Sequence, residues 1–155
     1  MTNILFVCHG NICRSPMAEF VMKDLIKKAG LESECQIASA ATSREEIGND
    51  IHPGTKGKLR EMGIPFSHRW AVQLTATDGR EYDYLIGMDR YNLRNMRSIV
   101  REEDWHKISL LLDFCGESRD VADPWYTGDF DATWDDIDRG CRALLQRLFP
   151  AHKVV

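Results

Sequence analysis

Apolar residues along this chain occur either in short unbroken runs or at intervals of three to four positions. The unbroken runs predict buried strands at residues 4–7, 36–40, 82–86 and 108–112. The spaced positions predict four helices. The first follows Pro16, the second runs from about Gly54 to Met62, and the third extends from a cap at Asp89 to about Ile99. The fourth is a C-terminal helix that ends at Pro150. Because strands alternate with helices, we expect an α/β fold in which a parallel sheet carries helices on both faces.

The first and last predicted helices show the clearest pattern. In the first, which has a predicted stop at Gly30, the apolar positions recur every four residues at Met17, Val21, Leu25 and Ala29. In the last, the apolar stripe consists of Trp134, Ile137, Cys141, Leu144, Leu145 and Leu148. No repeat, low-complexity segment or linker interrupts the chain, so we expect residues 1–155 to form a single domain.

Composition narrows the class of protein. The 155 residues are 43% hydrophobic and 28% charged, which is typical of a soluble globular domain. No apolar run approaches the roughly 18 residues that a membrane span needs, and the first residues lack the features of a secretory signal. We therefore expect a cytoplasmic protein with no membrane partner. The net charge of −4 argues against a nucleic-acid partner, because proteins that bind nucleic acids usually present a basic face.

Cysteines and acidic residues are the two chemical features that stand out. The five cysteines are an odd number, and in a reducing compartment they indicate free thiols, one of which is a candidate for catalysis. Acidic residues crowd one stretch, namely Asp113, Glu117, Asp120, Asp123, Asp129, Asp131, Asp135, Asp136 and Asp138. The pattern leaves open whether this stretch is a solvated surface or an acidic rim around a site.

The segment between the first strand and the first helix carries the candidate chemistry. It places Cys8 and Arg14 at the two ends of a loop that contains Gly10. A loop that joins a strand end to a helix start can point successive N–H groups at one anion beside the positive end of the helix dipole. Arg14 can add two parallel hydrogen bonds to phosphoryl oxygens. We therefore predict a phosphate-binding loop.

The same field should favour the thiolate form of Cys8, which makes Cys8 the predicted nucleophile. Cys141 and Arg147 repeat the spacing, but they lie inside the predicted C-terminal helix, where no loop can wrap around an anion. A leaving alkoxide or phenolate also needs a proton donor. Asp123, followed by proline and two aromatic residues, is the best candidate, although eight other acids lie nearby.

These segments together resemble the low-molecular-weight protein tyrosine phosphatases. The resemblance rests on the loop at residues 7–16 and on the sequence DPWY at residues 123–126. It continues in family order through residues 39–43, 48–49, 63–68 and 88–93, so that it covers essentially the whole chain. It implies a four-stranded parallel sheet, no metal and no other cofactor, and a phosphocysteine intermediate on Cys8 with Asp123 as general acid and base.

The resemblance also implies roles for other residues of the loop and its surroundings. The phosphate would be bound by the loop residues His9, Gly10, Asn11, Ile12, Cys13 and Ser15. The side chains that would hold the loop in shape are Asn11, Ser39 and His68, while Ser15 would donate a hydrogen bond to the sulfur of Cys8. Cys13 would be able to trap an oxidised Cys8 as a disulfide, or would simply pack the loop.

The resemblance further implies a substrate class. Ile12 stands where the related phosphoarginine hydrolases carry threonine, which favours phosphotyrosine. Trp125 and Tyr126 would form aromatic walls of the pocket. Glu45 stands where family members often present an aromatic residue, so we expect it at the substrate rim. The expected partner is a tyrosine-phosphorylated protein, with tyrosine kinases among the candidates, and the expected state is a monomer or weak dimer.

Two other functions compete with this one. A thioredoxin-coupled arsenate reductase shares such a loop but needs additional redox cysteines in the middle of the chain, and there is none between Cys35 and Cys115. A non-catalytic phosphate-binding module would be expected to lose Cys8 or Asp123, and both are present. Phosphotyrosine hydrolysis is therefore the predicted function.

Overall fold

The structure, a computed structural model, describes residues 1–151 and contains one four-stranded sheet. All of its strands are parallel, in the order β2-β1-β3-β4. Their bounds are Thr2–Cys8 for β1, Cys35–Ala41 for β2, Tyr84–Gly87 for β3 and Ile108–Leu110 for β4. The predicted α/β fold with a four-stranded parallel sheet is confirmed. Within the described residues, no helix combines the length and the apolar character needed to cross a membrane.

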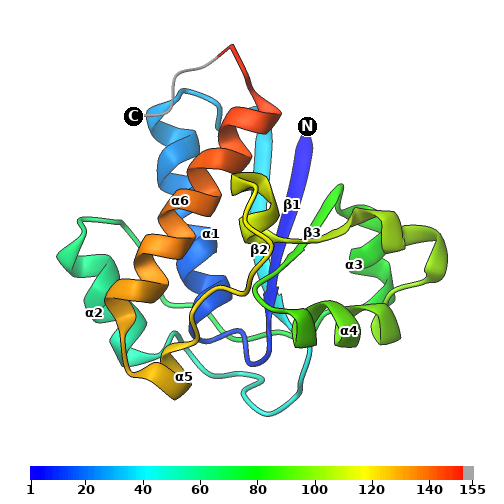
Figure 1. The fold of residues 1–155 in the computed structure, drawn as a ribbon, viewed down its shortest axis with the longest axis horizontal. Helices are drawn as coiled ribbons and strands as arrows, with labels where there is room; N and C mark the ends of the chain where they lie inside the picture. Colours follow the sequence, from blue (N-terminus) through cyan, green and yellow to red (C-terminus); the bar gives the residue numbers. More distant parts are fainter. Residues whose placement is uncertain (152–155) are drawn as a thin grey trace.

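Helices cover both faces of this sheet (Figure 1). On one side lie α1 (Arg14–Lys28), α2 (Pro53–Glu61) and α6 (Phe130–Leu148), and on the other lie α3 (Ala76–Glu81) and α4 (Arg90–Ile99). The short segments are the 3₁₀ helices η1 (Glu102–Lys107) and η2 (Leu111–Cys115) and the helix α5 (Pro124–Thr127).

The central strand β1 explains why its sequence is an unbroken apolar run. Ile4 and Phe6 belong to the larger core beneath α1 and α6, whereas Leu5 and Val7 belong to the second core beneath α4. Successive side chains of a strand point to opposite faces, so a strand covered on both faces needs apolar residues at every position. This burial fixes the end of β1, and with it Cys8, at the middle of the carboxyl edge of the sheet.

Most predicted boundaries lie within two residues of the observed ones, but the fourth strand is shorter than expected. β4 ends at Leu110, and the buried residues Leu111 and Leu112 belong to η2 instead. The Asp113 side chain accepts a hydrogen bond from the Leu110 amide and thereby turns the chain out of the sheet. The prediction of strand over 108–112 was therefore wrong at its end, because Leu111 is apolar for a different reason, which is packing beside Gly140 of α6.

Three predicted helix ends are confirmed in detail. Asp89 caps α4 by accepting a hydrogen bond from the Asn92 amide at 2.7 Å, and Gly30 follows α1 with a φ of 71°. α6 ends at Leu148, before Pro150. The helix α3 was not predicted, although Thr75 and Asp78 form a capping box at its start, a spacing that is visible in the sequence.

The acidic stretch from residue 113 to 138 is mostly occupied by caps and ion pairs rather than freely solvated. Asp123 and Asp129 cap α5 and α6, while Asp131 pairs with Lys58. The most buried of these carboxylates, Asp136, accepts from Arg119 at 2.7 Å and from the Ala122 amide at 3.0 Å. Asp136 therefore holds the segment that leads into Asp123 against α6.

We expect Asp136→Asn to lower the free energy of unfolding at neutral pH by about 2 kcal/mol, because it removes the buried carboxylate that pairs with both Arg119 and Arg139. Burial disfavours the Asp136 carboxylate, but the hydrogen bonds from Arg119 and Ala122 and the charge of Arg139 outweigh it and lower the pKa of Asp136 below its usual value. A lowered pKa adds stability that is present above the unfolded value and is lost as the pH falls below about 4.

Urea unfolding at pH 7 and near pH 3 checks this prediction. The difference between wild type and Asp136→Asn should shrink at the lower pH. The matched control is Asp138→Asn, also in α6. It removes a carboxylate that pairs with Arg142 in the next turn of the helix, and it should lower the free energy of unfolding by at most about 0.5 kcal/mol. An equal loss in both variants would contradict the assigned role of Asp136.

Candidate active site

The loop from Cys8 to Arg14 leaves the carboxyl end of β1 and enters α1 directly. Its tightest point is Asn11, which has a φ of 57° although it is not glycine. The Asn11 side chain donates to the hydroxyls of Ser15 and Ser39, both at 2.9 Å, and its oxygen accepts from the Val72 amide at 3.1 Å. These bonds hold a backbone conformation that side chains rarely adopt. Of the residues expected to support the loop, Asn11 and Ser39 are therefore in contact, and Ser15 joins them.

Cys8 lies at the bottom of this loop, with only 3% of its surface exposed. Its sulfur lies 3.0 Å from the Ser15 hydroxyl and 3.4 Å from the Ser15 amide, which donates to it. The sulfur also faces the first turn of α1, where the helix dipole is positive. Each of these contacts stabilises a negative charge on sulfur, and Ser15 occupies the predicted position.

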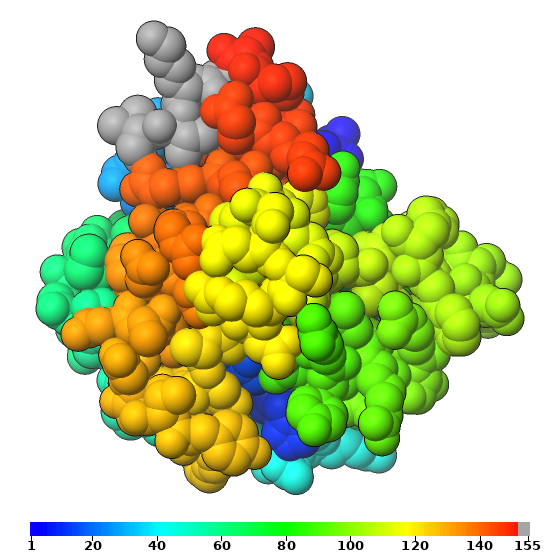
Figure 2. Space-filling model, in the orientation of Figure 1, coloured from blue at the N-terminus to red at the C-terminus, as the bar shows by residue number. Residues whose placement is uncertain are grey.

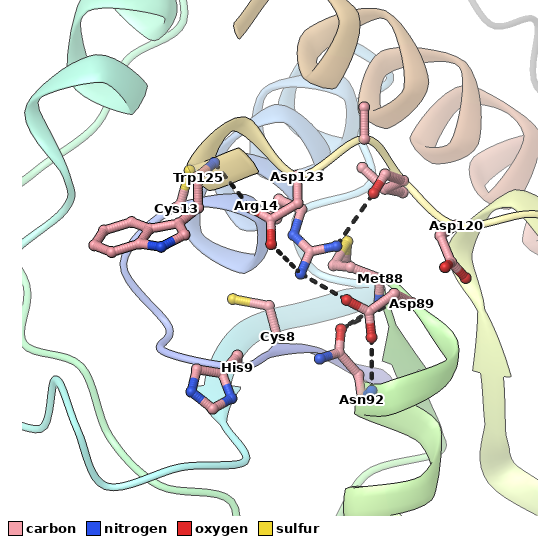
Figure 3. A network of polar contacts seen from close by, with 12 residues as sticks. Cys8, His9, Cys13, Arg14, Met88, Asp89, Asn92, Asp120, Asp123 and Trp125 are labelled. Atoms are coloured by element: carbon pink, nitrogen blue, oxygen red, sulfur yellow. Dashed lines mark hydrogen bonds and ion pairs between the residues drawn. The ribbon is translucent and has the colours of Figure 1, made fainter. Parts of the chain in front are cut away.

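Arg14 is 3% exposed and is held by two segments that are distant in sequence, one at residue 89 and the other at residues 121–123. Its guanidinium donates to the Val121 carbonyl at 3.2 Å and to the Asp89 carboxylate at 2.8 Å, and it lies 3.3 Å from the Asp123 carboxylate. Burial lowers the pKa of Arg14, but the charges of Cys8, Asp123 and Asp89 outweigh it, so that the net shift is upward. The cation is therefore permanently charged and aimed beside the sulfur (Figure 3).

Asp89 was predicted only as a helix cap, and its second role was missed. One carboxylate oxygen caps α4 and the other binds Arg14. The sequence did contain a signal for this second role. Asp89 follows the carboxyl end of β3, which pairs with β1, and ligands of parallel sheets bind at that edge.

Asp123 reaches the same space from the opposite wall. It caps the short helix α5 by accepting from the Trp125 amide at 3.1 Å, which leaves its other oxygen directed at Arg14. Figure 3 shows its carboxylate above the sulfur of Cys8. Trp125 and Tyr126 are 76% and 85% exposed, so that they extend into solvent from this wall. In Figure 2 the blue N-terminal residues are visible at the base of a hollow between the yellow and orange segment of this wall and the green segment of α4.

The structure places His68 outside the network around the loop. Its ring nitrogen Nδ1 lies 2.9 Å from Asp50, and the ring packs edge-on against Trp70. The expected support of the loop by His68 is therefore wrong in this structure, because Asp50 draws the imidazole toward itself. The neighbouring residue Arg69 contacts the loop instead, donating to Asn11 and Ser39.

Glu45, expected at the substrate rim, lies beside His9 of the phosphate loop. Its carboxylate is 3.0 Å from Nε2 of His9, and its side chain is 71% exposed. The segment that carries it is tied to the phosphate loop, because the Ser43 amide donates to the His9 carbonyl at 3.0 Å. The next side chain, Glu46, packs on Gly10, where an added Cβ would meet it at 3.2 Å.

The remaining cysteines differ in their surroundings. The Cys13 thiol accepts a hydrogen bond from Thr55 at 3.2 Å, and burial raises the pKa of Cys13 to about 12 despite that bond. Cys141 is fully buried within α6, so its spacing from Arg147 has no bearing on an anion site. Within residues 1–151, no three or more His, Cys, Asp or Glu side chains are grouped so as to bind a metal ion.

Comparison with known proteins agrees with this geometry. Residues 3–153 match the sequence model of the family described as low molecular weight phosphotyrosine protein phosphatase. The low molecular weight protein-tyrosine-phosphatase YfkJ of Bacillus subtilis is 43% identical over 147 residues, which make up 94% of each chain. The crystal structure of YfkJ has a TM-score of 0.93 at 41% identity and covers 97% of this chain and 96% of its own.

Two further solved structures are similar. The low molecular weight protein tyrosine phosphatase SP-PTP from Streptococcus pyogenes has a TM-score of 0.86 at 42% identity, covering 96% of this chain and 93% of that one. A Drosophila arginine phosphatase has a TM-score of 0.84 at 28% identity, covering 96% and 98%. A family match that spans almost every residue, together with relatives of this identity, shows that this chain is an enzyme of the low molecular weight protein-tyrosine-phosphatase family, in which catalysis depends on a cysteine.

Proposed function

We propose that this enzyme hydrolyses phosphotyrosine in proteins through a phosphocysteine intermediate on Cys8. The observation that carries the proposal is the convergence of the Cys8 sulfur, the buried Arg14 guanidinium and the Asp123 carboxyl group on one space at the end of β1. A nucleophile, a cation for the phosphoryl oxygens and a proton donor are the three groups that the reaction needs.

In the first step the Cys8 thiolate attacks phosphorus while the bond from phosphorus to the tyrosine oxygen breaks. Arg14 and the inward amides of the loop bind the three phosphoryl oxygens, and protonated Asp123 gives its proton to the departing phenolate. Protonation of Asp123 also removes its ion pair with Arg14, which frees a guanidinium N–H for the phosphoryl group.

In the second step the Asp123 carboxylate accepts a proton from water, and the water oxygen attacks phosphorus. The bond from sulfur to phosphorus breaks, inorganic phosphate leaves, and the thiolate of Cys8 is restored. The Ser15 hydroxyl, 3.0 Å from the sulfur, stabilises this returning negative charge.

Selection for an aryl phosphate is supported by the walls of the site. The exposed ring of Trp125 lies near Asp123 (Figure 3), and the exposed Tyr126 follows it in sequence, so that both can contact a phenyl ring that bears the phosphate. The fold alone does not decide between substrates, because an arginine phosphatase shares it. Ile12, at the position where phosphoarginine hydrolases of this fold are expected to have threonine, supports phosphotyrosine.

A redox relay of the arsenate reductase type finds no support in the position of Cys35. Cys35 starts β2, whereas the residue of β2 that lies opposite Cys8 is Ala41 at its other end. Burial raises the pKa of Cys35 to about 11.

We further propose that the enzyme acts in the cytoplasm, as a monomer or weak dimer, on tyrosine-phosphorylated proteins such as kinases. The five cysteines are all free thiols, which supports a reducing compartment.

The function is tested by comparing rates on phosphotyrosine, phosphoserine and phosphoarginine peptides. We expect phosphotyrosine to be preferred and Cys8→Ser to lower kcat by at least about 100-fold while phosphate binding persists, because the loop survives but the nucleophile is lost. The matched control is Cys141→Ser, which should remain nearly fully active. Turnover in Cys8→Ser above this limit, or a preference for phosphoarginine, would overturn the proposal.

The role of Asp123 predicts a dependence on the leaving group. Asp123→Ala should lower kcat/KM strongly for an alkyl-substituted phenyl phosphate, whose phenolate needs a proton, by about 100-fold or more. It should have a much smaller effect on an aryl phosphate with an acidic phenol. The control is Asp120→Ala, since Asp120 accepts from the Arg90 amide and has no contact with Arg14 among the described hydrogen bonds. A loss that is independent of leaving-group basicity would rule out Asp123 as the acid.

Glu45 predicts a preference for basic sequences around the phosphotyrosine. Glu45→Tyr should raise kcat/KM on peptides by about 2- to 10-fold, because an aromatic side chain can stack on the substrate ring and a carboxylate cannot. The gain should be larger for an acidic than for a basic peptide, and the difference should shrink with salt as screening weakens the charge effect. If the ratio of the two rates stays unchanged, Glu45 does not contact the substrate.

A further inference from the structure

Arg69 reaches beneath the phosphate loop from the segment that precedes α3. One guanidinium nitrogen donates to the Asn11 carbonyl at 2.5 Å, and the other donates to the Asn11 side-chain oxygen and, at 3.4 Å, to the Ser39 hydroxyl. The Arg69 amide is itself anchored to the Asp50 carboxylate at 3.2 Å. Arg69 thus binds both the backbone carbonyl and the side chain of Asn11, the residue with the positive φ.

The bond to the Asn11 carbonyl has a consequence for the adjacent amide. In a trans peptide the C=O and the N–H of one peptide plane point in opposite directions, and no cis peptide occurs among the described residues. Because Arg69 fixes the Asn11 carbonyl toward itself, the Ile12 N–H of the same plane is directed away from Arg69. A guanidinium fork that binds two oxygens of one residue sets this orientation more firmly than a single donor would.

Arg69 also contributes charge. It is partly buried, and burial lowers the pKa of its guanidinium, while the negative charges of Glu19, Cys8 and Asp50 act in the opposite direction. A guanidinium remains protonated in such surroundings. Of these carboxylates, Glu19 accepts from Ser39 at 2.5 Å and pairs with Lys23 at 2.6 Å. Arg69 therefore places a cation behind the phosphate loop in addition to Arg14.

We propose that Arg69 is a positioning residue for phosphate binding, which locks Asn11 so that the amide of Ile12 faces the anion and which supports the bound dianion with its charge. This inference rests on the proposed phosphatase site, but it concerns the affinity of the loop for phosphate rather than the chemical step. Arg69 touches neither the substrate nor the sulfur. Its role is thereby distinct from that of Arg14, whose guanidinium lies beside Cys8 (Figure 3).

Inorganic phosphate is the probe, and its inhibition constant against an aryl phosphate is the measurement. We expect Arg69→Met to raise this constant by about 10-fold or more, a change that corresponds to ~1.4 kcal/mol. Arg69→Lys should recover only part of the affinity, because lysine restores the charge but not the fork. An inhibition constant does not depend on how much of the protein is folded, so simple destabilisation would lower the apparent kcat and leave this constant unchanged.

The matched control is Arg60→Met, which makes the same chemical change at an exposed arginine whose guanidinium lies 5.3 Å from the centre of the Phe66 ring, on α2. It should leave phosphate inhibition unchanged. Equal inhibition constants for wild type and Arg69→Met would overturn the inference. If Arg69→Lys had the inhibition constant of wild type, the role assigned to the two-nitrogen contact of the guanidinium would be wrong. Direct calorimetric titration with phosphate separates this result from the proposed function, because it measures binding even if wild type hydrolyses none of the substrates.

Discussion

The catalytic site depends on one backbone constraint, the left-handed conformation of Asn11 in the middle of the phosphate loop. A loop this short can point several amides at one anion only if the chain reverses its curvature within it. Asn11 pays for this conformation with hydrogen bonds from its own side chain to Ser15 and Ser39 and with those that it accepts from Val72 and Arg69. The loop is therefore assembled by segments from three regions of the chain.

The burial of Arg14 is the second constraint. A buried cation is costly unless charged partners surround it, and here Asp89 and Asp123 come from the two walls of the site. These partners draw the start of α4 and the start of α5 toward the end of β1. The same contacts that offset the desolvation of the guanidinium thus define the width of the hollow in Figure 2.

Local patterns in the sequence were sufficient to predict the parts of the fold that depend on local physics. The doubly buried β1, the glycine-containing loop and the helix after Pro16 follow from burial and backbone preferences, and they place Cys8 and Arg14 correctly. His68 and Arg69 are adjacent in sequence, but Asp50 pairs with the His68 ring, while the Arg69 side chain contacts the loop. Such a choice depends on tertiary contacts, which neither residue type nor spacing reveals. The same holds for Leu111, whose apolar character reflects packing against a helix rather than membership of a strand.

The two oxygens of Asp89 have a consequence for how this enzyme can change over generations. One oxygen starts a helix and the other neutralises the arginine of the active site. A substitution that suits one task, such as serine for the cap, abandons the other, and the longer glutamate would have to move its carboxyl group away from both partners at once. Position 89 therefore tolerates few substitutions, whereas the solvent-exposed rings of Trp125 and Tyr126 can be exchanged without disturbing the scaffold.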